Sequence, residues 1–430
     1  MKKIVLSLAG VLAATAFAPE ASAIPAFARQ TGMACTACHA QHFPILNGFG
    51  RAFKAGGYTM MGAQGKVEGD HLSLPDTLNA SIVMKIRYQD NNTAGPVGAS
   101  DSVGQNAGGG QLQFFDEFAL LFGGRIADNV GFILEGQMMN TGPLAASFRM
   151  PFTYDLGAAK LSVTPFTTDA FSAQYGYELS SGGIMRANRW AEHRAETSAV
   201  QYLANGGDSA ANGLGGATGF AFVAQNDMGF INLTKFNTSV LPGGSNSNNG
   251  AGGDLDSNYV RIVATPTVAN WAMVVGLGKA SGSSYSNIAG GKIDTDQTFF
   301  DFQAQGEVAG KELGVYFQHA KAPAGQGVRN AYNVSNCAAG TACNPDKKAT
   351  VIGADYSVIP HVLSIGAAYR GADTGGAAAT NGDDAWTITG VYDLYQNVAL
   401  HINYSSYSGS SRNAANAVKN LMTLMLEASW

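Results

Sequence analysis

Apolar and polar side chains alternate along many short segments of this 430-residue chain. In the segment 78–89 (LNASIVMKIRYQ), one set of alternate positions is apolar and the other is polar or charged. The apolar set is Leu78, Ala80, Ile82, Met84, Ile86 and Tyr88, and the polar set is Asn79, Ser81, Lys85, Arg87 and Gln89. Successive side chains of a β-strand point to opposite faces, so such a segment predicts a strand with one apolar face. The same alternation recurs at 298–308 and 421–430.

Repeated strands of this kind predict either a transmembrane β-barrel with a polar interior or a soluble β-sandwich. Only 13% of the residues are charged, against about 25% in typical soluble domains. The last strand ends in a tryptophan, Trp430. A mean hydropathy of −0.01 argues against a helical membrane protein, which needs repeated apolar runs of about 20 residues. These features favour the barrel.

The lengths of the expected connections also favour a barrel. We expect about 16 antiparallel strands, which start near residues 78, 112, 130, 146, 160, 217, 230, 259, 271, 298, 312, 349, 362, 385, 398 and 421. Tight turns (126–129, 226–229, 268–270, 394–397) alternate with long, glycine-rich loops (91–110, 239–258, 279–296, 320–348, 371–384). Outer-membrane barrels have short periplasmic turns and long external loops. An even number of strands then puts both chain ends on the periplasmic side.

The start of the chain, residues 1–23, has the pattern of a secretory signal peptide. Lys2 and Lys3 precede an apolar run that ends in Ala21-Ser22-Ala23, a small-residue cleavage site. The alternative is a retained membrane anchor. We therefore expect three regions: a signal peptide (1–23), a small α-helical domain (24–77) and a barrel (78–430) of a Gram-negative outer membrane.

The small domain contains the motif C-x-x-C-H, formed by Cys35, Cys38 and His39. In c-type haem attachment, the two thiols add to the haem vinyl groups and the histidine becomes the proximal iron ligand. A thioredoxin-like redox pair is the alternative, but such a pair does not require the histidine that follows the second cysteine. The motif therefore predicts one covalent haem c.

The residues around this motif predict a small haem-binding wrap. The stretch 44–57 (PILNGFGRAFKAGG) predicts a short helix that begins at Pro44 and carries Ile45, Phe49 and Phe53 on one face. A domain of this size has little core of its own, so we expect it to need the haem and the barrel, which it would plug. Met60 or Met61 is the candidate distal iron ligand; the alternatives are packing beside Tyr58 and an iron without a sixth protein ligand.

Two further features carry weaker signals. Cys337 and Cys343, in a loop of an exported protein, predict a disulfide, with a metal site as the weaker alternative. The long loop 169–216 contains IMRANRWAEHRAE (184–196), which predicts a charged helix either inside the pore mouth or on the surface. A net charge of −5 argues against nucleic acid as a partner.

The stretches PAFARQTGMACTACH and PILNGFGRAFKAGGYTM, followed by a barrel, resemble the fused monohaem cytochrome–porin iron oxidases of bacteria. The resemblance covers the architecture of the whole mature chain and is specific over 24–61. It implies oxidation of extracellular Fe(II) at a single haem and transfer of the electron to a periplasmic cytochrome or copper protein. It also implies that Cys35 and Cys38 attach the haem and that His39 is its proximal ligand.

Two alternatives remain at this stage. One is an electron conduit of the same build for another extracellular donor, and the other is a porin whose haem-binding segment is a structural plug. Acidic residues of the loops would attract Fe(II), a cation that suits oxygen ligands, although any soluble surface carries such residues. They are Asp90, Asp101, Asp254, Asp256, Asp373, Asp383 and Asp384.

Overall fold

The fold is taken from a computed structural model of the chain. It describes residues 25–62, 64–93, 109–138, 145–169, 172–180, 190–204, 216–239, 254–286, 291–325, 329–333, 346–415 and 417–430. The expected signal peptide (1–23) and the expected disulfide partners Cys337 and Cys343 lie outside these residues. No helix of the described part is long and apolar enough to cross a bilayer.

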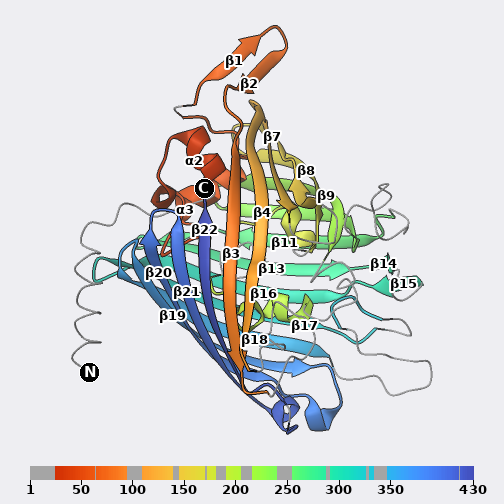
Figure 1. The fold of residues 1–430 in the computed structure, drawn as a ribbon. Helices are drawn as coiled ribbons and strands as arrows, with labels where there is room; N and C mark the ends of the chain where they lie inside the picture. The colour runs from red at the N-terminus through yellow and green to blue at the C-terminus, as the bar shows by residue number, and fades with distance from the viewer. Residues whose placement is uncertain are drawn as a thin grey trace, which may run out of the picture.

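Antiparallel strands form a closed barrel (Figure 1). Most of its strands are single segments: β3 (Ala80–Asn91), β4 (Gln111–Ala127), β5 (Val130–Gln137), β8 (Lys160–Thr168), β9 (Ala217–Asn226), β10 (Gly229–Asn237), β13 (Trp271–Ser281), β16 (Gln297–Val308), β17 (Lys311–Ala322), β18 (Lys347–Ile359), β19 (Leu363–Thr374), β20 (Asp384–Tyr395), β21 (Val398–Ser408) and β22 (Asn420–Ser429).

Two further strands are each split into two segments. β6 (Ala145–Arg149) and β7 (Phe152–Asp155) both pair with β5 and β8, and β11 (Ser257–Ala264) and β12 (Thr267–Val268) both pair with β13. The barrel therefore has 16 strands. The expected strand number is confirmed, and each expected start lies within two residues of the observed one.

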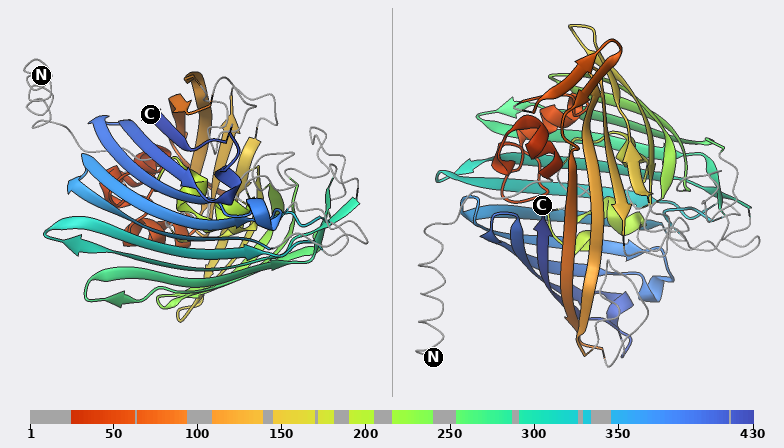
Figure 2. Two further views of the ribbon diagram at one scale, coloured as in Figure 1. Left: turned by 90° about the horizontal axis from the view of Figure 1, so that it is seen from below. Right: turned by 45° about the horizontal axis from the view of Figure 1, so that its top comes forward.

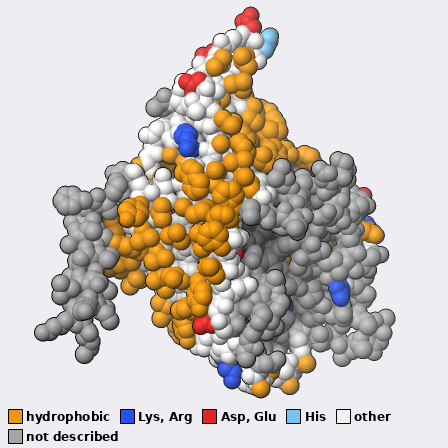
Figure 3. Space-filling view, viewed as in Figure 1, with side chains coloured by type: hydrophobic (Ala, Val, Ile, Leu, Met, Phe, Trp, Pro, Cys, Tyr) orange, Lys and Arg blue, Asp and Glu red, His pale blue; other side chains and the backbone are white. Residues whose placement is uncertain are grey.

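The two faces of the strands differ as the alternation predicts. In β3, Ile82, Met84 and Ile86 point outward, and Ser81, Lys85 and Arg87 are buried on the inner side. In β22, Met422 and Leu424 are exposed, and Thr423 and Glu427 are buried. Apolar side chains cover much of the outer wall around β3 and β22 (Figure 3). A lipid-facing exterior and a polar interior follow from this arrangement.

The two ends of the barrel differ in their connections. At one end, here called the short-turn end, two-residue turns join β4 to β5, β16 to β17 and β20 to β21. β3 begins and β22 finishes at this same end, where the backbone of Trp430 pairs with that of Ile82. The other end, here called the long-loop end, carries the long connections.

Segments from outside the barrel wall occupy its interior. The N-terminal segment 25–62 contains α2 (Pro25–Thr31), the 3-10 turn η2 (Cys35–Ala37) and α3 (Gly48–Ala55), and it lies within the curve of the strands (Figure 2). The inserted loop, defined as residues 172–180 and 190–204, contains η3 (Ala173–Gly176), α4 (Arg194–Thr197) and α5 (Ala199–Ala204). Of the two positions expected for the charged loop, the inner one is right, because its described residues are buried. Arg186 and Arg189 lie outside the described residues.

Short elements outside the barrel complete the fold. β1 (Lys66–Gly69) and β2 (Leu72–Pro75) form a hairpin that projects beyond the short-turn end (Figure 1). β14 (Ser283–Ser286) and β15 (Gly291–Asp294) form a second hairpin, and η6 (Ala378–Thr380) and η7 (Ser410–Arg412) are 3-10 turns of the long-loop end.

Replacement of Ile388 by lysine tests the lipid-facing wall. Ile388 is 64% exposed in the middle of β20, and a lysine near the bilayer midplane costs about 2–4 kcal/mol. We expect Ile388→Lys to lower the free energy of unfolding by this amount in lipid vesicles, measured by urea titration. Ile388→Leu is the control and should unfold as the wild type does. Equal stability of both variants would contradict a hydrocarbon-facing position.

Candidate functional site

Cys35, Cys38 and His39 lie on one tight turn of the N-terminal segment. The backbone N–H groups of Cys38 and His39 both donate to the carbonyl oxygen of Cys35, each at 3.0 Å. All three residues are partly exposed. A single turn therefore brings two thiols and one imidazole together on a surface that remains accessible.

The imidazole of His39 is held by the chain that follows it. Its Nδ1 lies 3.3 Å from the carbonyl oxygen of Ile45, and His39 forms an isolated β-bridge with Leu46. In the tautomer that donates from Nδ1, the lone pair of Nε2 is available to a metal, the usual arrangement of metal-binding histidines. Burial lowers the pKa of His39 to about 4, so the ring is neutral at pH 7, as an iron ligand must be.

Helix α3 packs directly on the Cys-x-x-Cys-His turn. Asn47 connects the two: its backbone N–H donates to the carbonyl of Cys38 at 3.0 Å, and its side chain accepts from Gly50 N–H at 2.9 Å. A Cβ atom at Gly50 would lie 2.2 Å from the carbonyl oxygen of Cys38. The close approach of this helix to the motif therefore requires glycine at position 50.

The observed helix corrects one detail of the sequence prediction. It begins at Gly48 with Asn47 as N-cap, whereas the prediction began it at Pro44. Ile45 is fully buried but precedes the helix, and of the two helical phenylalanines Phe53 is buried and Phe49 exposed. The helix begins four residues later than Pro44 because the Asn47 side chain accepts a hydrogen bond from a first-turn N–H group.

Three large apolar side chains of this segment are exposed. Met33, Phe49 and Met60 are 38%, 40% and 36% exposed, respectively. Apolar exposure next to two thiols and a metal-competent imidazole fits a haem, whose covalent attachment would cover such a surface. The donor set and its surroundings thus fit the predicted haem c.

The chain at the two candidate distal methionines is fixed to α2. Gln30 Nε2 donates to the carbonyl oxygens of Tyr58 and Met60 at 2.7 and 2.8 Å. Phe27 stacks on Tyr58 with ring centroids 5.1 Å apart, and Phe53 packs edge-on against both rings. The start and the end of the segment are therefore joined by a small aromatic core. A distal role of Met60 or Met61 stays a prediction.

Polar contacts join the N-terminal segment to the inner wall of the barrel. Arg51 Nη1 donates to Gln305 Oε1 of β16 at 2.5 Å, and His42 Nε2 lies 3.0 Å from Asp355 Oδ2 of β18. Burial lowers the pKa of His42, but the Asp355 carboxylate outweighs it, so that the net pKa is raised. Gln225 of β9 donates to the carbonyl of Ala55 at 2.7 Å. These contacts hold the Cys-x-x-Cys-His turn near the short-turn end.

The inserted loop supports the N-terminal segment from the other side. Trp190, fully buried, stacks on Tyr316 with ring centroids 5.5 Å apart. Ala40 and Ile45 belong to the same buried cluster as this aromatic pair. Ile45, whose carbonyl oxygen contacts Nδ1 of His39, thus shares a buried cluster with Trp190, 145 positions further along the chain. No local pattern in the sequence indicates this contact.

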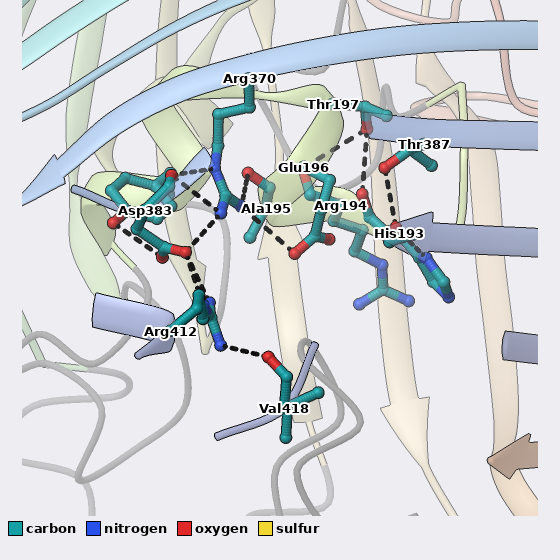
Figure 4. Close-up of polar contacts among 12 residues, drawn as sticks. His193, Arg194, Ala195, Glu196, Thr197, Arg370, Asp383, Thr387, Arg412 and Val418 are labelled. Atoms are coloured by element: carbon teal, nitrogen blue, oxygen red, sulfur yellow. Dashed lines mark hydrogen bonds and ion pairs between the residues drawn. The ribbon is translucent and has the colours of Figure 1, made fainter. Parts of the chain in front are cut away.

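Buried ion pairs hold the inserted loop in the interior. Arg261 of β11 bonds Glu178 at 2.9 Å and Asp301 of β16 at 2.5 Å, and all three side chains are almost fully buried. Arg370 of β19 pairs with Glu196 and Asp383 at 3.2 Å each (Figure 4). The loss of one partner of a buried pair costs several kcal/mol, so these contacts strongly favour the inserted position.

A histidine of the inserted loop completes this network. His193 Nδ1 lies 2.6 Å from Ser405 Oγ, and its Nε2 lies 2.7 Å from Thr423 Oγ1. The neighbouring Glu192 pairs with Arg87 of β3 at 2.9 Å. The sequence prediction assigned this loop no role; the charged residues inside a long polar loop were the only signal available.

The described residues contain no group of three or more His, Cys, Asp or Glu side chains placed to hold a metal ion. Several of the acidic residues considered for Fe(II) have cationic partners instead: Asp256 with Lys292 at 2.5 Å, and Asp373 with Lys348 at 2.9 Å. Asp383 pairs with Arg370 and Arg412, and Asp101 lies outside the described residues. These partners reduce the attraction of the loops for cations.

No protein-family model matches the sequence, and neither does any curated protein. Among solved structures, the outer membrane channel DcaP of Acinetobacter baumannii aligns with a TM-score of 0.51 and 11% identity, over 82% of this chain and 97% of that chain. OmpT of Vibrio cholerae aligns with a TM-score of 0.45 and 10% identity, over 85% and 100% of the two chains. The likeness to DcaP shows that the fold is a porin-like outer-membrane barrel.

Substitution of Gly50 tests the packing of α3 on the motif. The added methyl group of Gly50→Ala would collide with the Cys38 carbonyl, and overpacking of this kind costs about 1–3 kcal/mol. We expect a lower yield of covalent haem per polypeptide, measured by intact-protein mass spectrometry. Gly48→Ala is the matched control in the same helix, because the nearest atom to its Cβ lies 4.0 Å away. Equal yields from the two variants would show that the close approach is not needed.

Proposed function

We propose that this chain is an outer-membrane electron-transfer protein, in which one covalent haem c in the domain 24–77 accepts an electron from extracellular Fe(II). The observation that carries the proposal is the Cys35–Cys38–His39 turn inside a porin-like barrel, with Nδ1 of His39 held by the Ile45 carbonyl. A porin that serves diffusion alone has no need for this donor set. The electron would pass to a periplasmic cytochrome or copper protein.

The haem, when bound, would supply an iron that gains and loses one electron. The residues of the chain bind and orient it. Cys35 and Cys38 would attach the haem through thioethers, and His39 Nε2 would be the proximal ligand. The Arg51–Gln305 and His42–Asp355 contacts fix this turn against the wall and would hold the haem at one place in the barrel.

The direction of transfer depends on the placement of the barrel in the membrane. We place the short-turn end, with both ends of the barrel sequence, on the periplasmic side, because outer-membrane barrels have short periplasmic turns. Export would use the signal peptide 1–23, and the loop cysteines Cys337 and Cys343 would form a disulfide in that compartment. Oxidation of Fe(II) outside the periplasm keeps poorly soluble Fe(III) out of the cell.

The filled interior bears on the alternative of a diffusion porin. The fold likeness supports a porin, yet the inner faces of β16, β18 and β19 are buried by the N-terminal segment and the inserted loop. A path for solutes through the barrel interior along these strands would be narrow. A hydrated solute needs an open path, so the filled interior argues against free diffusion along these strands.

Anaerobic addition of Fe(II) to the purified, oxidised protein tests the proposed function. We expect the absorption band of reduced haem to appear, with loss of the covalent haem in a Cys35→Ala/Cys38→Ala variant. His39→Ala should keep covalent haem but change its spectrum, whereas the exposed His71→Ala is a control that should behave as the wild type.

Each outcome of this experiment separates the alternatives. Reduction by dithionite but not by Fe(II) would exclude iron as donor and retain an electron conduit for another donor. The absence of covalent haem from the wild type would exclude electron transfer altogether. A large ion conductance in planar bilayers, together with no reduction, would establish the porin.

Single replacements of the two methionines test the distal ligand. Met60→Leu and Met61→Leu keep apolar volume but remove the sulfur. We expect one of them to convert a low-spin haem spectrum to a high-spin one, because methionine occupies the sixth position. Met33→Leu, another exposed methionine of the segment, is the control. If neither variant changes the spin state, neither methionine is the ligand.

A further inference from the structure

The outer wall of the barrel has an apolar groove lined by residues of β11, β13, β16 and β17. These four strands are neighbours in the barrel (Figure 1). Its volume is about 410 Å³. Val260, Ile262, Leu277 and Phe300 form its apolar walls, and each is at least 36% exposed. A groove of this kind on a lipid-facing wall is open to acyl chains and closed to the interior of the barrel.

The register of the strands places one end of the groove at the edge of the apolar belt. One polar row on the outer face follows the register of four strands. Lys279 of β13 lies opposite Thr298 of β16, Thr298 opposite Lys321 of β17, and Lys321 opposite Lys348 of β18. Two residues closer to the short-turn end, Leu277 and Phe300 face outward in the next row. We take this polar row of β13 to β18 as the boundary of the hydrocarbon layer on the long-loop side; on β11 the position paired with Lys279 is the apolar Val260.

The cations of this row are not equivalent. Lys321 pairs with Asp346 at 2.5 Å and Lys348 with Asp373 at 2.9 Å. Lys279, which lines the groove, forms no salt bridge among the described residues, although its charge acts on the nearby carboxyl group of Asp296. His319 also lines the groove, and its Nδ1 lies 2.8 Å from Thr350 Oγ1. The loop-side end of the groove thus carries the ammonium group of Lys279, and the imidazole of His319 lies one row nearer the short-turn end, opposite Phe300.

We propose that this groove binds a phosphate-bearing lipid of the leaflet on the long-loop side. One acyl chain lies along Val260, Ile262, Leu277 and Phe300, and the phosphate meets Lys279 and His319. A free phosphate ion does not fit, because most of the groove is apolar; the volume lies in the range of pockets that hold small ligands, about 300–1,000 Å³. The inference rests on the membrane placement proposed above and is independent of the haem.

Native mass spectrometry of the detergent-purified protein tests this site. The probes are dimyristoyl phosphatidylglycerol, which carries a net negative charge, and dimyristoyl phosphatidylcholine, which does not. We expect one phosphatidylglycerol molecule to be retained in preference to phosphatidylcholine. Lys279→Gln should weaken this retention about fivefold, the effect of one cation near anionic lipid, and Lys279→Gln/His319→Gln should weaken it further.

A filled groove and a distant cation provide the controls. Val260→Phe, which partly fills the apolar groove, should lower the retention of both lipids. Lys348→Gln, outside the groove, should keep the wild-type preference for phosphatidylglycerol over phosphatidylcholine. Heat-modified gel migration verifies that each variant is folded. Equal retention of the two lipids, or unchanged binding in the double variant, would overturn the proposal. A protein that does not enter lipid vesicles at all would instead refute the membrane placement.

Discussion

The hydrogen bonds between β22 and β3 are the contact on which the rest of the structure depends. They join the last strand to the first, from Leu421 with Asn91 to Ser429 with Val83, and they leave the sheet without an edge. Unpaired backbone groups cost several kcal/mol each in hydrocarbon, so only a closed barrel can cross a bilayer with strands. Closure also creates an interior, and everything inside it must match a polar wall.

The polar inner face needs partners, and the inserted segments provide them. Arg261 and Arg370 each pair with one carboxylate outside the inserted loop, Asp301 and Asp383, and with a second one from it, Glu178 and Glu196. The N-terminal segment uses the same wall through Arg51 and His42. The two segments meet at Trp190 and Ile45, so the wall and the inserted loop together hold the segment that carries the Cys-x-x-Cys-His turn. A segment too small to form its own core is ordered in this way by the barrel.

Local patterns predicted most of the wall. Alternation at Ile82, Met84 and Ile86, and turns of two residues, depend only on neighbouring positions, and the strand starts agree with the structure for this reason. The start of helix α3 at Gly48 is also local, because the neighbouring Asn47 caps it, but the prediction relied on Pro44 instead. Other features depend on distant residues. The position of the inserted loop depends on ion pairs with strands that are distant in sequence.

The amino-acid sequence by itself determined the barrel class, the number of strands and the identity of the C-x-x-C-H motif, because periodicity and motif spacing are local properties of the chain. Only the tertiary structure decided where that motif lies, what holds His39 and whether the interior is open. These depend on side chains such as Gln305, Asp355 and Trp190, which become neighbours of the motif only when the barrel closes. The register that aligns Lys279 with the polar outer row is decided in the same way.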